Sequence, residues 1–244
     1  MRYFRICCVV ATSLAMLAPS TAASQQKKLA AFYSPDTVQT IHLQVKSEDL
    51  QKMKAALPKR IYVPASFRWR DITITNVAVR YKGNSSSRPN QRFKRSFLIR
   101  FDKFKRGARF AGLRRVSFDN GVQFGSLFSE PIVTEILRAE GVKTHRANYA
   151  RVFLNKKFHG VYVNVERIDQ SFIAHRLDDP DGSLFKVDLG GPGANLQFIG
   201  KDPAAYRRTF EAKSKPASQD IGKLVEFIRN NNQQRRVGDP GVAG

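Results

Sequence analysis

Alternation of apolar and polar residues runs through much of the chain and predicts β-strands. A period of two puts successive side chains on opposite faces of a sheet. The pattern covers Val38 to Val45, Phe67 to Arg80, Phe93 to Phe101, Leu113 to Phe118, Asn148 to Leu154, Phe158 to Glu166 and Leu184 to Val187. Asn155, Lys156 and Lys157 separate two of these stretches, which predicts a hairpin with a tight turn.

Helices are predicted between and after the strands, two of them from apolar residues at helical spacing, in Ser126 to Glu140 and Gln219 to Asn230. The predicted helices cover Ser47 to Leu57, Ser126 to Glu140, Asp169 to Arg176 and Gln219 to Asn230. Ser47 precedes two acidic residues as an N-cap does, Pro58 stops the first helix, and Gly141 follows the second as a C-cap. The order of these elements indicates an α+β fold, built on an antiparallel sheet with a packed helix.

The two ends of the chain follow different patterns. Two arginines precede an apolar run from Ile6 to Leu17, and small residues follow, so residues 1–23 are interpreted as a secretory signal peptide of a secreted, cell-surface or periplasmic protein. A membrane anchor is the alternative, but a span needs roughly 20 apolar residues, and no later segment could cross a membrane. Residues 24–36 are polar and predict a linker. Residues 231–244 lack apolar periodicity and predict a disordered tail.

The composition adds constraints on fold and chemistry. With 244 residues, 42% of them hydrophobic and 25% charged, the chain resembles a soluble globular domain with its own core. Its cysteines, Cys7 and Cys8, both lie in the signal segment, so the mature chain is expected to have no disulfide, no cysteine-ligated metal and no thiol nucleophile. The histidines are scattered without metal-ligand spacing.

The charge balance is strongly basic. Lysine and arginine total 42 against 20 acidic residues, which gives a formal net charge of +22. Such a charge attracts nucleic acid, anionic wall polymers, acidic lipid or acidic proteins. Because export makes a specific nucleic-acid partner less fitting, one hypothesis is a non-catalytic module of the cell surface or wall that binds anionic polymers.

A polar loop with glycine and serine lies between two predicted strands. It runs from Tyr81 to Asn90 and is followed by Arg92, Lys94 and Arg95. Backbone amides in such a loop can hold phosphate oxygens, and neighbouring cations can neutralise them. A solvated hairpin loop in a basic protein is the alternative interpretation.

Several blocks of residues, taken together, resemble a known family. The blocks are Arg80 to Ser85, Phe93 to Phe101, Ala150 to Asn155, Gly160 to Asp169, Leu184 to Lys186 and Phe210 to Lys213. In this order they resemble the CotH family of spore coat proteins, so residues 37–230 are interpreted as a partial CotH kinase-like domain. The resemblance implies an atypical protein-kinase N-lobe with an incomplete C-lobe. It also implies transfer of the γ-phosphoryl group of ATP to Ser or Thr of a partner or coat protein, with Mg²⁺ or Mn²⁺.

The resemblance also implies roles for single residues. The candidate nucleotide contacts are Gly83, Ser85, Lys94, Glu166 and Lys186. Lys94 would act as a compact cation on the β and γ oxygens. The residues themselves leave alternatives open: Lys94 as one surface lysine among many, and Glu166 as a surface acid paired with Arg151 or Arg167.

The chain departs from the family where the chemistry would be completed. The family's catalytic aspartate, in an Asn-x-Asp segment followed by His-Asn, has no match, nor does its metal-binding aspartate in a Trp-Asp-x-Asp segment before Gly. The one tryptophan, Trp69, lies in the wrong half. No catalytic or metal-binding residue is therefore assigned. The chain is expected to be truncated, inactive by itself and left with exposed apolar surface.

Overall fold

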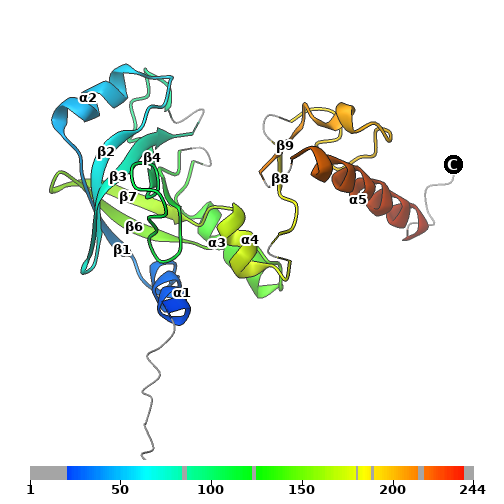
Figure 1. Cartoon of the computed structure of the whole chain (residues 1–244), viewed down its shortest axis with the longest axis horizontal. Helices are drawn as coiled ribbons and strands as arrows, with labels where there is room; N and C mark the ends of the chain where they lie inside the picture. The colour runs from blue at the N-terminus through cyan, green and yellow to red at the C-terminus, as the bar shows by residue number, and fades with distance from the viewer. Residues whose placement is uncertain are drawn as a thin grey trace, which may run out of the picture.

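Seven strands form a closed barrel in the computed structural model of the protein (Figure 1). The strands are β1 (Gln39–Gln44), β2 (Val63–Trp69), β3 (Ile72–Lys82), β4 (Ser96–Arg100), β5 (Arg115–Asp119), β6 (Ala147–Leu154) and β7 (Lys157–Val165). Around the barrel they are hydrogen-bonded in the order β1, β2, β3, β4, β5, β7, β6. The structure describes residues 21–83, 87–122, 125–179, 181–187, 190–213 and 217–238.

The barrel is closed by the pairing of β1 with β6, two strands that lie far apart in the sequence. β1 pairs antiparallel with β2, with Leu43 opposite Phe67, and parallel with β6, with Leu43 opposite Leu154. The other neighbours in the barrel pair antiparallel, as the sequence predicts, and the predicted turn joins β6 to β7. The expected antiparallel sheet is therefore a barrel with one parallel seam, and its strands leave no free edge.

Apolar side chains at every second strand position fill the barrel. In β2, Val63, Ala65, Phe67 and Trp69 are all buried. Phe110, from the loop between β4 and β5, joins them, with its ring centroid 5.0 Å from that of Phe67 and 5.5 Å from that of Trp69. Because side chains occupy the interior, a binding site has to lie on the outside of the barrel or at its ends.

The segment expected to be a linker is instead a helix that plugs one end of the barrel. Helix α1 (Thr21–Phe32) buries Leu29 and Phe32, and Tyr33 follows them into the core. The side-chain amides of Asn148 and Asn164 each donate a hydrogen bond to the carbonyl oxygen of Phe32, over 3.2 Å. The expectation that residues 24–36 form a linker is wrong. The segment is polar in composition, but Leu29, Phe32 and Tyr33 are spaced so that they share one face, and burial of that face holds the helix on the barrel.

The helix expected to pack on the sheet does so only in part. Helix α3 (Ser129–Ala139) lies beside β6, where Thr134 is buried. Its apolar residues and those next to it are exposed: Phe128, Ile132, Val133, Ile136 and Leu137. The expectation of a packed helix is therefore wrong for this apolar face. The closed barrel turns its own apolar face inward, and the neighbouring outer face of β6 carries Tyr149 and Arg151.

The two shorter predicted helices form close to the expected bounds. They are α2 (Ser47–Ala55) and α4 (Gln170–Arg176). Asp169 caps α4, because its Oδ1 accepts a hydrogen bond of 3.0 Å from the backbone nitrogen of Ser171. Phe172 and Ile173 are the buried residues of this helix. None of the described helices combines the length and the apolar character needed to cross a bilayer.

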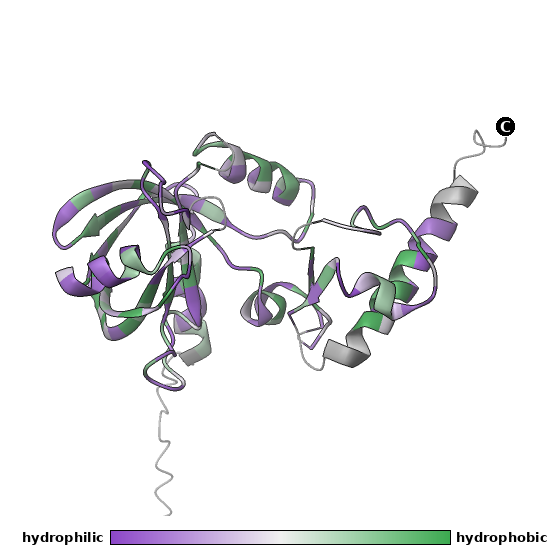
Figure 2. Ribbon diagram, turned by 90° about the horizontal axis from the view of Figure 1, so that it is seen from above, coloured by the Kyte–Doolittle hydropathy of each residue, from purple (hydrophilic) through white to green (hydrophobic). Residues whose placement is uncertain are grey.

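A second, smaller unit follows the barrel and has its own core. It contains β8 (Phe185–Val187), the 3₁₀ turn η2 (Pro203–Tyr206), β9 (Phe210–Ala212) and α5 (Ala217–Gly238). Its core consists of Tyr206, Phe210, Ile221, Leu224, Val225 and Ile228. In both views this unit lies on the side of the barrel that carries α3 and α4 (Figures 1 and 2). Residues 231–238 continue α5, so the expected disordered tail is wrong for them, and residues 239–244 lie outside the described residues.

Candidate anion-binding cleft

A cleft of about 490 Å³ lies where the outer face of the barrel meets the second unit. The barrel contributes residues from β3, β5 and β7, from the first turn of α3 and from the segments beside α3 and α4. The second unit contributes residues from β8 and after β9. The lining residues are Lys82, Arg115, Ser117, Glu130, His145, Val165, Glu166, Arg167, Ile168, Asp169, Leu184, Phe185, Lys186 and Lys213.

Strand alternation places the polar residues of β5 in this cleft. Val116 and Phe118 of β5 belong to the barrel core, so Arg115 and Ser117 belong to the opposite face of the strand. Ser117 is opposite Val165 in β7, and Arg167 follows two residues later. Two strands that pair directly therefore bring two arginines and a serine into one wall of the cleft.

Polar atoms in this wall are buried without a hydrogen-bond partner among the described residues. They are Nε of Arg115, Oγ of Ser117 and Nε of Arg167. The Arg167 Nε forms an ion pair with Oδ2 of Asp169, but at 4.0 Å this contact is too long for a hydrogen bond. Burial lowers the pKa of Arg167, and the positive charges of Arg115 and Arg80 lower it further, against the opposing charges of Asp169 and Tyr62. A buried donor that lacks a partner is costly, so this wall favours a ligand that brings acceptors and negative charge.

Lysines extend the positive charge of the cleft beyond this wall. Nζ of Lys82, at the end of β3, lies 2.6 Å from Oδ2 of Asp119. Lys213 forms an ion pair with Glu211 after β9. Lys186 is exposed on β8, so cations from both units surround the opening of the cleft.

Glu166, the acidic residue expected at the cleft, forms its buried floor. Arg146 and Glu166 flank the open end of the hairpin, where Ala147 pairs with Val165. Arg146 donates from Nη2 to Oε1 over 2.6 Å and from Nε to Oε2 over 2.9 Å, and Arg176 donates to Oε2 over 3.3 Å. Burial alone would raise the pKa of Glu166, but Arg146 and then Arg176 outweigh it and hold the pKa below its usual value.

The surroundings of Glu166 make it a positioning residue of the fold. Both of its carboxylate oxygens are occupied by arginine, and its side chain is 2% exposed. The alternative of a surface acid paired with Arg151 or Arg167 is wrong, since the acid is buried and its partners are Arg146 and Arg176. Oε2 accepts from the backbone and side chain of Arg146 and from Arg176, and two guanidinium groups balance the charge of the carboxylate.

The predicted nucleotide contacts have different outcomes. Glu166 and Lys186 line the cleft. Gly83 directly follows Lys82, has a φ of 95°, and its carbonyl oxygen accepts a hydrogen bond of 3.1 Å from Nη1 of Arg60. Ser85 lies outside the described residues.

Lys94 does not line the cleft that holds Glu166. Its Nζ lies 5.2 Å from the centroid of the Tyr162 ring, which is in the barrel core. A Cβ at Gly160 would come within 3.1 Å of Lys94 Cδ, so the lysine stem occupies the space that this glycine leaves. Burial lowers the pKa of Lys94. Of the two lysines that flank the polar loop, Lys82 lines the cleft and Lys94 does not.

The cleft does not fit a divalent metal through protein ligands alone. No group of three or more His, Cys, Asp or Glu residues among the described parts of the chain could hold a metal ion. The carboxylates near the cleft already serve other groups: Glu166 binds Arg146, Asp169 caps α4, and Oε1 of Glu130 lies 3.1 Å from Nε2 of His145. No metal-dependent step is therefore derived from these residues.

The fold and the cleft together define the class of this protein. It is an α+β protein whose closed barrel carries, on its outer face and next to a smaller unit, a cleft in which basic side chains outnumber acidic ones. The chain belongs to the CotH family: the family described as CotH kinase protein matches residues 79–238. This match includes every residue that lines the cleft and begins within β3, after α1, β1, α2 and β2. No curated protein matches the sequence.

Proposed function

We propose that the cleft binds the phosphate groups of a nucleotide such as ATP. The observation that carries this proposal is the set of buried polar atoms without hydrogen-bond partners, on Arg115, Ser117 and Arg167. Guanidinium groups bind phosphate oxygens in a planar, forked geometry, and a hydroxyl can donate to the same oxygens. The volume of the cleft, about 490 Å³, is in the range of small-molecule sites, which is roughly 300 to 1,000 Å³.

The roles of the cleft residues follow from their positions. Arg115 and Arg167 neutralise the phosphates at the buried wall, and Ser117 hydrogen-bonds between them. Lys186 adds positive charge from the exposed face of β8, and Lys82 adds it from the end of β3 while paired with Asp119. Glu166 does not contact the nucleotide and instead keeps Arg146 and Arg176 in place. In this proposal Lys94 has no direct contact with the nucleotide.

The family description and the chain's own residues support different parts of a kinase activity. Membership of the CotH kinase family supports phosphoryl transfer to a protein and an association with the spore coat or cell surface. Transfer also needs metal ligands and a residue that orients the acceptor hydroxyl. Neither aspartate segment of the family has a match here. In this proposal the chain by itself therefore binds the nucleotide but does not transfer its phosphoryl group. Export through a signal peptide in residues 1–23 is part of the same proposal.

Calorimetric titration of the whole chain with ATP tests the nucleotide proposal. ATP and inorganic triphosphate are expected to bind, whereas adenosine is not, because the cleft offers cations and no defined base pocket. Arg115→Gln and Arg167→Gln are each expected to weaken ATP binding by about tenfold or more, the effect of losing a hydrogen bond to a charged group. Arg115→Gln removes a desolvated charge whose Nε has no hydrogen-bond partner, so it is not expected to lower the melting temperature. Arg167→Gln also removes the 4.0 Å ion pair with Asp169 and is expected to lower the melting temperature slightly.

Lys94→Ala is the matched control, since Lys94 is also a half-buried cation next to a strand but lies outside the cleft. It is expected to bind ATP like the wild-type chain. Equal binding of adenosine and ATP, or a loss in Lys94→Ala as large as in Arg115→Gln, would contradict the proposed site.

A further inference from the structure

One end of the barrel gathers four segments that are distant in the sequence. They are α2, the turn before β2, the loop before β4 and the turn between β6 and β7. Asn155 of that turn joins β1 at Val45, accepting from its nitrogen over 2.8 Å and donating to its oxygen over 2.7 Å. Arg60 reaches the carbonyl of Gly83, and the stem of Lys94 packs over Gly160. These contacts hold the four segments together as one surface, here called the α2 end.

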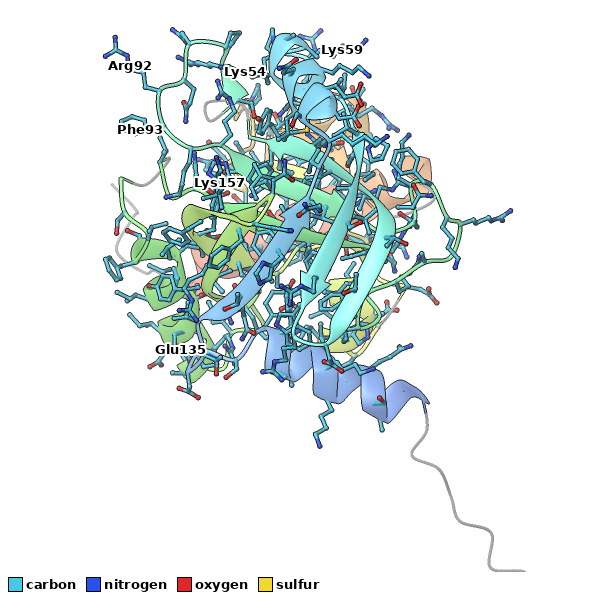
Figure 3. All side chains as sticks on the ribbon, turned by 90° about the vertical axis from the view of Figure 1, so that its left-hand side faces the viewer. Lys54, Lys59, Arg92, Phe93, Glu135 and Lys157 are labelled. Atoms are coloured by element: carbon cyan, nitrogen blue, oxygen red, sulfur yellow. The ribbon has the colours of Figure 1, made fainter. Side chains whose placement is uncertain are left out.

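The α2 end is densely cationic. Its exposed basic residues are Lys46, Lys52, Lys54, Lys59, Arg60, Arg88, Arg92, Lys156 and Lys157. The acidic residues of α2 are Glu48 and Asp49, and Asp49 forms an ion pair of 3.5 Å with Lys52. Figure 3 shows Lys54, Lys59, Arg92 and Lys157 on the same side of the molecule, well away from Glu135 on α3. The cations come from separate segments and cover a broad area, so they match an extended negative surface.

Two phenylalanines lie among these cations and are exposed. Phe93, next to Arg92, is 67% exposed, the largest value among the exposed large hydrophobic residues of the described chain. Phe158, next to Lys157, is 58% exposed, and its ring centroid lies 5.6 Å from that of Phe153. Phe93 has no packing role that explains an aromatic side chain at this loop position. A partner with both negative charge and an apolar interior accounts for the phenylalanines and the cations together.

We propose that the α2 end docks on an anionic lipid bilayer. The lysines and arginines are attracted to the charged headgroups, and Phe93 enters the boundary between headgroups and acyl chains. A linear polyanion such as polyphosphate also attracts the cations, but it gives an exposed phenyl ring no apolar environment. This surface is separate from the cleft, so the inference does not depend on nucleotide binding.

Sedimentation of the chain with lipid vesicles tests the inference. Binding is expected to vesicles rich in phosphatidylglycerol and not to pure phosphatidylcholine, and high salt is expected to weaken it strongly. Arg92→Gln and Lys157→Gln are each expected to lower vesicle binding by about fivefold, since each removes one cation near the membrane surface. Phe93→Ser is expected to lower it by about five- to tenfold, because the phenyl ring leaves the lipid.

Phe104→Ser is the matched control. Phe104 is 42% exposed between Lys103 and Lys105, but its loop leaves the opposite end of β4. Vesicle binding is expected to be unchanged in this variant and in Arg115→Gln, and Trp69 fluorescence confirms that each variant is folded. Three results would overturn the inference: no preference for phosphatidylglycerol, equal losses in Phe93→Ser and Phe104→Ser, or binding to polyphosphate or a single-stranded oligonucleotide that is stronger than to vesicles and indifferent to Phe93.

Discussion

Buried charge at the root of the β6–β7 hairpin shows how single residues shape the cleft. Arg146 and Glu166 are both nearly inaccessible and bind each other through two side-chain hydrogen bonds. Two charges removed from water are tolerated only when each compensates the other. Glu166 holds Arg146 and Arg176 in place by its ion pairs, and it lines the cleft next to Arg167. A glutamate in an exposed ion pair would add little to the free energy of unfolding, since such pairs contribute about 0 to 1 kcal/mol.

Replacing Glu166 by glutamine is expected to lower the free energy of unfolding by about 3 to 5 kcal/mol, because the charge of Arg146 stays buried without its partner. Urea unfolding, followed by Trp69 fluorescence near neutral pH, measures this change. Glu135→Gln is the control, since Glu135 is 55% exposed and pairs with Arg138 on the surface of α3. A loss below about 1 kcal/mol in Glu166→Gln would contradict the buried pair.

The Arg146–Glu166 pair is also expected to make the stability of the wild-type chain depend on pH in the acidic range. The folded-state pKa of Glu166 lies below its usual value, near 4.3 in an unfolded chain. Its contribution to stability is therefore fully present above that value and is lost as the pH falls through the folded-state pKa. Between neutral pH and acid, the stability of Glu166→Gln is expected to fall less than that of the wild type. Parallel losses in both proteins would contradict this prediction.

At the scale of an element, burial of a few apolar residues decides where helix α1 packs. Its polar face is solvated, but Leu29, Phe32 and Tyr33 close one end of the barrel. Phe32 contacts Tyr33, Trp69 and Phe110 edge-on, with ring centroids 4.9 to 5.5 Å apart. Such aromatic contacts add to the burial of apolar area. Helix α3 is the converse case, because its apolar residues find few partners on the outer face of a barrel whose apolar side is inside.

Phe32→Ala is expected to lower the free energy of unfolding by about 3 to 5 kcal/mol, because it leaves a cavity next to Trp69 and Phe110. Chemical unfolding followed by Trp69 fluorescence measures it. Lys28→Ala changes an exposed position of the same helix and is expected to have little effect. If both variants unfold like the wild type, α1 does not plug the barrel in solution.

At the scale of the whole molecule, the residues that the structure describes form two separate hydrophobic cores. The barrel core contains Trp69, whereas the core of the second unit is built around Tyr206 and one face of α5. Tyr206 is fully buried, and its hydroxyl accepts a hydrogen bond from the nitrogen of Ile199 and donates one to the oxygen of Gly200. Since the cleft takes residues from both units, its shape depends on both cores.

Tyr206→Ala is expected to unfold the second unit and leave the barrel folded. Trp69 is the only tryptophan, so its fluorescence reports on the barrel alone, whereas circular dichroism also reports on α5. The variant is expected to lose helical signal with an unchanged Trp69 transition. Arg207→Ala, at the exposed neighbouring position, is the control. A shift of the Trp69 transition equal to the loss of helix would show one cooperative unit instead.

Local pattern determined much of this protein in advance. Period-two alternation predicted most of the barrel strands, but the stretch from Phe67 to Arg80 missed the first half of β2 (Val63–Trp69), which a turn separates from β3 (Ile72–Lys82). The Asn155 to Lys157 turn predicted the β6–β7 hairpin, and Asp169 predicted the start of α4. The blocks of sequence also predicted the CotH family, which the match over residues 79–238 confirms. These features depend on backbone preferences and on neighbours within one turn or hairpin, so they are readable from a short window.

Only the tertiary structure decided which residues share a site. The parallel seam between β1 and β6 joins strands about a hundred residues apart, and no short window contains that register. The sequence pointed to Lys94 and offered the polar residues of β5 no role, yet the fold turns Lys94 toward Tyr162 and brings Arg115 and Ser117 to Arg167. A barrel has two faces and two ends. Which of them a side chain occupies depends on strand register and closure, and these are settled by long-range packing.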